Sequence, residues 1–265
     1  MDLTDAYENG KYIPDAASYP PRWAADSAAF RAGLGKRAKL DLAYGPHPRH
    51  RFDLFLPEHD PVGLVVFIHG GYWLKFDKSS WSNLAAGPVA RGWAVAMPSY
   101  RLAPEVRIAE ITRDAAAAVE AAAGLVAGPM VVSGHSAGGH LSSRMACADV
   151  GLTVARRIKR VVPISPVSDL RPLLHTAMNA ELRLDQAEAE AESPMLKRDL
   201  IDAEVTVWVG AEERPSFLDQ ARWLAEAWPG AGHRVAPGMH HFDVIEELAL
   251  ANSPLTKALL DGVAG

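Results

Sequence analysis

Residues 130–138 have the sequence MVVSGHSAG, in which a short apolar run leads directly into the pattern Gly-x-Ser-x-Gly with Ser136 at its centre. Residues 137–148, which follow, have a helical composition. A serine at a sharp turn from strand to helix exposes its hydroxyl, and glycines on either side leave room for that backbone. This context predicts Ser136 as a nucleophile. The alternative is a chance glycine-rich loop, because the pattern alone is only moderately specific.

Apolar runs of strand length recur before and after this stretch, and helical stretches separate them. The predicted buried strands are residues 64–68, 93–97, 130–132, 161–164 and 205–209, and the predicted helices are residues 108–123, 137–148 and 215–228. Continuous apolar runs are typical of parallel strands that are buried on both faces. The sequence therefore predicts an α/β fold with a mostly parallel central sheet and helices on both faces.

Three further kinds of segment complete a predicted single domain of residues 1–265. Alternating polar and apolar residues at 39–44 and 51–56 predict two half-exposed strands at an antiparallel edge of the sheet. Residues 1–36 are rich in proline, alanine and aromatic residues without a clear period, and we expect an N-terminal arm or cap there. Residues 166–200 are rich in Glu, Ala and Leu, and we expect a helical insertion that could form a lid.

The segment HGGYW at residues 69–73 directly follows the first of the predicted buried strands. Consecutive glycines allow backbone N–H groups to face a substrate oxygen, and a tetrahedral intermediate requires at least two such donors. We expect these donors to be the N–H groups of Gly71 and Ala137, with Gly70 or Tyr72 as further candidates. The alternative is an ordinary Gly-Gly turn after a strand.

Side chains beside these two loops are candidates for substrate binding. Tyr72 and Trp73 would form the wall of an aromatic pocket, although ordinary core packing is an equal alternative for aromatic residues at this place. His135, next to the predicted nucleophile, is a candidate substrate contact or a structural hydrogen-bonding residue. His135 and His69 are too closely tied to their loops to serve as the base.

The catalytic base is expected to follow an acid in chain order, after the last strand. Of the ten histidines, His240 and His241 lie in the segment GMHHFD at residues 238–243, between a predicted short strand at 233–236 and a helical stretch. A histidine at this place can reach the end of the sheet where the nucleophile lies. We predict His241 as the base, with His240 as the rival.

The acid is expected in the loop after the last of the buried strands, where residues 210–215 have the sequence GAEERP. Because this loop lacks aspartate, we predict Glu213, with Glu212 as the rival. A glutamate can orient the imidazole and stabilise the imidazolium as an aspartate does. Both glutamates could instead be solvated acids at a helix N-terminus, and Asp169 and Asp243 are fallback candidates.

Composition excludes several other classes of function. The formal net charge is −5 and no run of Lys and Arg occurs, so we expect no nucleic-acid partner. The longest apolar runs, such as residues 62–68, are too short to span a bilayer, and the single cysteine, Cys147, suits a reducing compartment. We expect a cytoplasmic protein with a small-molecule substrate, with homodimer formation left open. Neither metal-ligand spacing nor a dinucleotide or P-loop glycine pattern is present, so no metal and no cofactor are implied.

Taken together, these motifs resemble the hormone-sensitive-lipase-like branch of the α/β-hydrolases and, within it, the serine-dependent arylformamidases (kynurenine formamidases). The HGGYW form of the oxyanion motif is the most specific feature. The resemblance covers about residues 40–250, and its matching stretches are residues 44–55, 69–73, 100–105, 134–139, 209–217 and 241–246. The chain departs from the family at Glu213, where an aspartate is usual.

The resemblance implies hydrolysis of an N-formyl aryl amide, such as N-formyl-kynurenine, to formate and the free arylamine. The residues themselves indicate acyl transfer to water through an acyl-enzyme and do not specify the acyl group. A short-chain carboxylesterase or another small-amide hydrolase would use the same machinery. A non-catalytic small-ligand binding protein is a third alternative, because fold does not dictate function.

Overall fold

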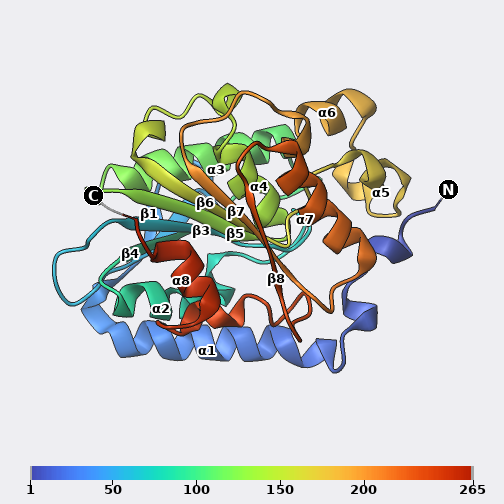
Figure 1. Cartoon of the computed structure of the whole chain (residues 1–265). Coiled ribbons are helices and arrows are strands. Elements are labelled where there is room, and N and C mark those ends of the chain that lie inside the picture. The colour runs from blue at the N-terminus through green and yellow to red at the C-terminus, as the bar shows by residue number, and fades with distance from the viewer. Residues whose placement is uncertain (1, 264–265) are drawn as a thin grey trace.

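A twisted sheet with strand order β1-β2-β4-β3-β5-β6-β7-β8 forms the centre of the computed structural model, which describes residues 2–263 (Figure 1). The strands are β1 (Ala38–Ala43), β2 (Arg51–Phe55), β3 (Leu64–Ile68), β4 (Ala94–Pro98), β5 (Met130–His135), β6 (Ile158–Ile164), β7 (Glu204–Gly210) and β8 (Gly232–Ala236). β2 pairs antiparallel with both β1 and β4, and the pairs from β4 to β8 are parallel. The predicted antiparallel edge and parallel centre are confirmed. The prediction that both strands of this edge are half-exposed is wrong for β2, which is buried at four of its five residues because it lies between β1 and β4.

The register of the central strands brings the loops of the site together. β3, β4 and β5 are buried along their whole length. Ile68 of β3 pairs with Gly134 of β5, and His135 of β5 pairs with Ile164 of β6. Because the strands are parallel, the segments that follow them leave the same edge of the sheet, which is where ligands bind in folds of this type.

Helices cover both faces of the sheet (Figure 1). One face carries α3 (Ile108–Ala123), α4 (Ala137–Met145) and α7 (Pro215–Ala227), and the other carries α1 (Tyr19–Leu34), α2 (Ala86–Ala90) and α8 (Pro254–Leu260). Each layer of helices encloses its own hydrophobic cluster against the sheet. The predicted helices on both faces are confirmed, although the predicted helix 137–148 ends at Met145 and continues as a separate short turn.

Short helical turns make up most of the connections. The 3₁₀ helices are η1 (Asp5–Tyr7), η2 (Gly10–Tyr12), η3 (Ala16–Ser18), η4 (Gly35–Arg37), η5 (Lys78–Ser80), η6 (Ser82–Ala85), η7 (Ala148–Val150), η8 (Ala155–Arg157), η9 (Arg171–His175), η10 (Pro194–Leu196) and η11 (Glu246–Ala249). Residues 166–200 contain the short helices α5 (Asn179–Leu182) and α6 (Gln186–Ala191), together with η9 and η10. The helical pieces of this segment are one or two turns long.

The N-terminal residues form more regular structure than the sequence indicated. Residues 5–18 contain three 3₁₀ turns, and the 16-residue helix α1 follows them. Only Trp23 and Ser27 of α1 are buried, so this helix has no apolar stripe that a periodicity could reveal. The two prolines at its start, Pro20 and Pro21, are a signal for a helix N-terminus that the sequence analysis did not use.

Candidate active site

Ser136 lies at the sharp turn between β5 and α4. Its backbone has φ 57° and ψ −115°, a conformation that costs a non-glycine residue about 1–3 kcal/mol and that clusters at functional sites. The flanking glycines make this turn possible. A Cβ atom on Gly138 would lie 1.9 Å from the carbonyl oxygen of Ile68, and one on Gly134 would lie 2.2 Å from that of Gly138. The turn is thus packed so closely that only glycine fits on either side of the serine.

His241 and Glu213 form a buried pair, and His241 lines the same cleft as Ser136. The Nδ1–H of His241 donates to Oε2 of Glu213 at 2.6 Å, and the two residues are 3% and 6% exposed. The imidazole ring packs between the rings of His135 and Phe217, with centroid distances of 4.5 and 4.4 Å. This arrangement fixes the imidazole with Nδ1 protonated, which leaves Nε2 free to accept a proton.

The rival histidine makes different contacts. His240 hydrogen bonds through Nε2 with the Tyr19 hydroxyl at 3.1 Å, and its Nδ1 accepts from the backbone N–H of Phe242 at 3.2 Å. Its own backbone N–H donates to Asp243 at 2.7 Å. His240 therefore connects the loop to α1, and Asp243 belongs to that same small network.

A second set of hydrogen bonds holds the other oxygen of Glu213. Oε1 accepts from the backbone N–H of Gly210 at 2.8 Å and from the hydroxyl of Ser165. A Cβ atom on Gly210 would lie 2.3 Å from the Met239 carbonyl oxygen and 3.3 Å from Cγ of Glu213, so this glycine leaves space for the longer acid. Ser165 was not among the residues predicted from the sequence. Its signal is a small polar residue immediately after the buried strand β6.

The other acidic candidates lie away from His241. Glu212 is exposed, and its backbone N–H donates to the Met239 carbonyl oxygen at 2.9 Å. Asp169 accepts from the side chain and the backbone of Arg171 at 2.7–3.0 Å. Among the acids that were considered, Glu213 is thus the one that the structure joins to His241.

The HGGYW segment lies against the serine turn. A Cβ atom on Gly70 would lie 2.9 Å from the His135 carbonyl oxygen and 3.2 Å from Cβ of Ser136, so the Gly70 backbone borders the serine directly. Gly71 has φ 118°, a value that favours glycine. Ala137 is the first residue of α4, where backbone N–H groups have no partner within the helix. Gly70 and Ala137 therefore flank Ser136 on two sides, and Gly71 lines the same cleft.

The three predicted substrate contacts have different surroundings. Tyr72 and His135 line the cleft at Ser136. Trp73 does not: its side chain is fully buried and packs edge-on against His140, with a centroid distance of 5.2 Å. The prediction that Trp73 forms a wall of the substrate pocket is corrected accordingly, because core packing, the other alternative, describes its placement.

Burial lowers the pKa of two histidines near the serine, His135 and His69. Burial, together with the nearby His241, lowers the pKa of His135 well below its ordinary value. Burial likewise lowers the pKa of His69 to about 4. The His69 ring stacks on Tyr100 at 4.4 Å, and its Nδ1–H donates to the Gly70 carbonyl oxygen at 2.7 Å, so this residue supports the glycine loop.

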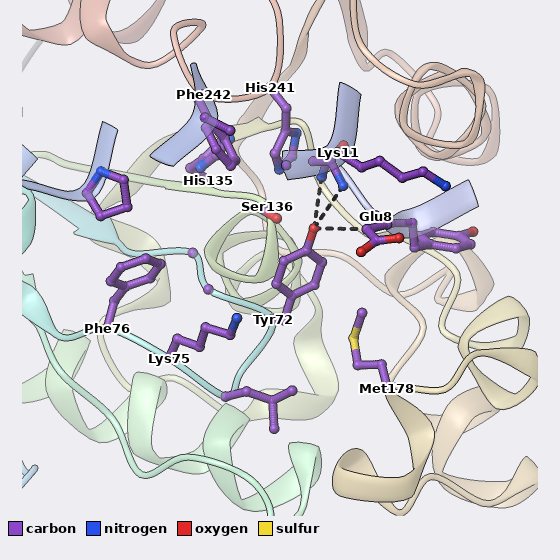
Figure 2. Close-up of a pocket in the computed structure, with 18 of the residues that line it drawn as sticks. Glu8, Lys11, Tyr72, Lys75, Phe76, His135, Ser136, Met178, His241 and Phe242 are labelled. Carbon is purple, nitrogen blue, oxygen red and sulfur yellow. Dashed lines mark hydrogen bonds between the residues drawn. The ribbon is translucent and has the colours of Figure 1, made fainter. Parts of the chain in front are cut away.

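A cleft of about 600 Å³ opens in front of Ser136 and His241 (Figure 2). On one side of the serine, Phe76 and Phe242 face the cleft, and the Trp23 ring contacts both of theirs. We call this side the aromatic end. On the other side, the cleft is lined by Glu8, Lys11, Tyr72 and Met178, with Lys75 below the serine. We call this side the polar end, and much of it comes from the N-terminal residues that the sequence analysis described as an arm or cap.

Within residues 2–263, no group of three or more His, Cys, Asp or Glu side chains is arranged to hold a metal ion. No helix in that range is long and apolar enough to cross a membrane.

Comparison with known proteins places this geometry in a family. The family model described as α/β hydrolase fold matches residues 65–236. This chain belongs to the α/β-hydrolase family. It is a hydrolase, and within the family it is arylformamidase-like. Kynurenine formamidase from Danio rerio is 29% identical over 94% of this chain and 93% of that protein. The Drosophila melanogaster kynurenine formamidase is 31% identical over 82% of this chain and 79% of that protein.

Solved structures agree with this assignment of the fold. A crystal structure from Silicibacter sp. TM1040, described as that of a candidate thioesterase, is 59% identical, with a TM-score of 0.96 over 98% of this chain and 99% of that one. Esterase B from Lactobacillus rhamnosis, with a bound phosphonate inhibitor, is 19% identical, with a TM-score of 0.68 over 92% of this chain and 91% of that one. At that identity the second likeness shows the fold alone.

Proposed function

We propose that the chain is a serine hydrolase in which Ser136 is the nucleophile, His241 the base and Glu213 the acid. The buried hydrogen bond between His241 and Glu213, beside a serine in a strained turn after β5, carries this proposal. The backbone N–H groups of Gly71 and Ala137 form the oxyanion hole, with Gly70 as a further donor. Serine hydrolysis requires a nucleophile, a base and an acid, and here each of them comes from a separate loop.

The mechanism follows from these positions. Nε2 of His241 takes the Ser136 proton as the serine oxygen attacks the substrate carbonyl, and the backbone N–H groups bind the oxyanion. The imidazolium, which Glu213 stabilises, then donates its proton to the leaving nitrogen. Water attacks the acyl-enzyme with His241 again acting as base, which releases the acid and restores the serine.

The proposed substrate is an aryl formamide with an amino-acid side chain, such as N-formyl-kynurenine. Two curated relatives that align with most of this chain are kynurenine formamidases. The aromatic end of the cleft offers ring faces and edges for an aryl group, which is a favourable setting for aromatic contacts. The cleft volume of about 600 Å³ lies in the range of small-molecule sites.

Charges at the polar end suit a zwitterionic substrate. Glu8 and Lys75 both line the cleft, and within residues 2–263 neither side chain forms an ion pair with another residue. We assign Lys75 to the substrate carboxylate and Glu8 to its ammonium group. An ester or thioester of a small acid would need only the shared machinery at Ser136 and neither of these charges.

Substrate comparison tests the proposal. The kcat/KM of the wild-type protein would be measured for N-formyl-kynurenine, for formanilide, which lacks the amino-acid group, and for p-nitrophenyl acetate. We expect the highest value for N-formyl-kynurenine, and the variant Lys75→Met should reduce the preference for it over formanilide by about 10-fold. Turnover of the ester alone would transfer the proposal to a short-chain carboxylesterase. Failure to react with a serine-directed phosphonate would instead favour a binding protein.

A further inference from the structure

The oxyanion loop contains three consecutive residues with left-handed backbone. Gly71, Tyr72 and Trp73 have φ values of 118°, 58° and 60°. Glycine accepts such values readily, whereas large side chains such as those of tyrosine and tryptophan do so only where their surroundings hold them. Contacts on both sides of the loop must therefore maintain the conformation in which Gly71 lines the cleft at Ser136.

The body of the domain holds one side of this loop. The Trp73 side chain is fully buried between sheet and helices, and its carbonyl oxygen accepts from the backbone N–H of Ala103 at 2.9 Å. The backbone N–H of Leu74 donates back to the Gly71 carbonyl oxygen at 2.9 Å. These contacts fix the loop after Tyr72 and leave the Tyr72 side chain free to make contacts of its own.

The N-terminal segment, residues 3–12, holds the other side through the hydroxyl of Tyr72. That hydroxyl donates to the Tyr7 carbonyl oxygen at 3.0 Å and accepts from the side-chain and backbone N–H groups of Asn9 at 3.2 and 3.4 Å (Figure 2). Asn9 is 1% exposed, and burial raises the pKa of Tyr72. The tyrosine of the HGGYW motif is thus a partly buried anchor whose hydroxyl both donates and accepts hydrogen bonds.

The same segment is bonded to α7, the helix that begins just after Glu213. The hydroxyl of Ser216 donates to the Ala6 carbonyl oxygen, and the side-chain amide of Gln220 donates to the Tyr7 hydroxyl at 2.9 Å. The Tyr7 ring packs edge-on against Phe217, whose other neighbour is the imidazole of His241. The N-terminal segment therefore connects the oxyanion loop to the helix behind the acid and the base.

We propose that the N-terminal segment is a positioning element for the oxyanion hole and acts through Tyr72, an inference that rests on the proposed serine mechanism. Oxyanion donors work because they are held in place before charge develops. A displacement of about 1 Å costs about 100-fold in rate. Loss of the Tyr72 hydroxyl releases the loop on one side, whereas the ring that lines the cleft stays in place.

The variant Tyr72→Phe tests this inference. We expect kcat to fall about 10- to 100-fold while KM changes less than about 3-fold, because the donors matter most in the transition state. A boronic acid, which forms a tetrahedral adduct with the serine, should lose affinity by a similar factor. The matched control is Tyr44→Phe: that hydroxyl also donates to a backbone carbonyl oxygen, of Ser99 at 2.6 Å, and Tyr44 does not line the cleft.

A double-mutant cycle with Asn9→Ala completes the test. Both changes act on one anchor, so Asn9→Ala should lower kcat in the wild type and have little further effect in Tyr72→Phe. Should Tyr72→Phe fail to fold, Asn9→Ala alone is compared with Tyr44→Phe at equal melting temperature. A kcat or boronate affinity that is no lower than in the control overturns the inference.

The failure of the proposed function looks different from the failure of this inference. Wild-type protein that binds no boronate and keeps its activity after Ser136→Ala would refute the serine mechanism itself. Wild-type protein that binds boronate, with Tyr72→Phe unchanged, would refute only the positioning role. The assay can use p-nitrophenyl acetate or N-formyl-kynurenine, whichever the wild type hydrolyses, so the outcome does not depend on the assignment of the substrate.

Discussion

Shortening Glu213 by one methylene group, in Glu213→Asp, should separate two sets of contacts that the glutamate now makes together. Oε2 accepts from His241 at 2.6 Å, while Oε1 accepts from Gly210 at 2.8 Å and from Ser165. One carbon–carbon bond is about 1.5 Å long, so a carboxylate that keeps the Gly210 contact would lie about 4 Å from His241. That distance exceeds the limit for a hydrogen bond.

A misplacement of this size predicts a loss of about 100-fold in kcat for Glu213→Asp. Complete removal of the acid, in Glu213→Ala, should lower kcat about 10³- to 10⁴-fold. Without the carboxylate, nothing holds the imidazole in the tautomer with Nδ1 protonated, and the imidazolium has no counter-charge. Steady-state kinetics on the best substrate would measure both values. The matched control is Glu212→Ala, since that side chain is exposed and should change kcat less than about 2-fold. A larger loss in Glu212→Ala, or full activity in Glu213→Ala, would refute this reasoning.

Three further predictions follow from buried polar groups. Ser165→Ala should lower kcat about 10-fold in the wild type and have little further effect in Glu213→Gln, and additive losses would show that the hydroxyl does not act through the acid. Burial lowers the pKa of His140 to about 4. The unfolded chain therefore binds the proton first as the pH falls below about 6.5, and this residue alone removes about 1.4 kcal/mol of stability per pH unit down to about pH 4. Urea unfolding of His140→Gln should show a weaker pH dependence, and an unchanged dependence would contradict the assignment. Burial raises the pKa of Cys147 to about 11, so a thiol reagent should label it only on unfolding, and rapid labelling of the native protein would be inconsistent with its burial.

Patterns of local sequence predicted much of the fold. The buried parallel strands are continuous apolar runs, which indicate their environment within a few residues. The alternation at residues 51–55 did not do so, because β2 lies between β1 and β4 and its polar residue Asp53 is buried in an ion pair with Lys78. Helix α1 could not be found in this way, because only two of its residues are buried and its helical state depends on packing against η5 and η6.

The candidate site likewise combines features that local sequence predicts with features that depend on contacts between distant residues. The glycines around Ser136 are required by the local backbone, and their spacing is visible in the sequence. The choice of Glu213 over Glu212 depended on a side-chain contact with a loop 28 residues further along the chain, which local sequence does not specify. Ser165 is 48 residues from its partner Glu213, and Asn9 is 63 residues from its partner Tyr72. Local sequence therefore did not predict either contact.

The most direct test of the central claim is formate release from N-formyl-kynurenine by the wild-type protein and by Ser136→Ala. We predict a wild-type kcat/KM of about 10⁴ M⁻¹s⁻¹ or more. In Ser136→Ala at an unchanged fold, formate release should fall at least about 10³-fold. Formate release that persists in Ser136→Ala at more than about a tenth of the wild-type rate would contradict the assignment of Ser136 as the nucleophile.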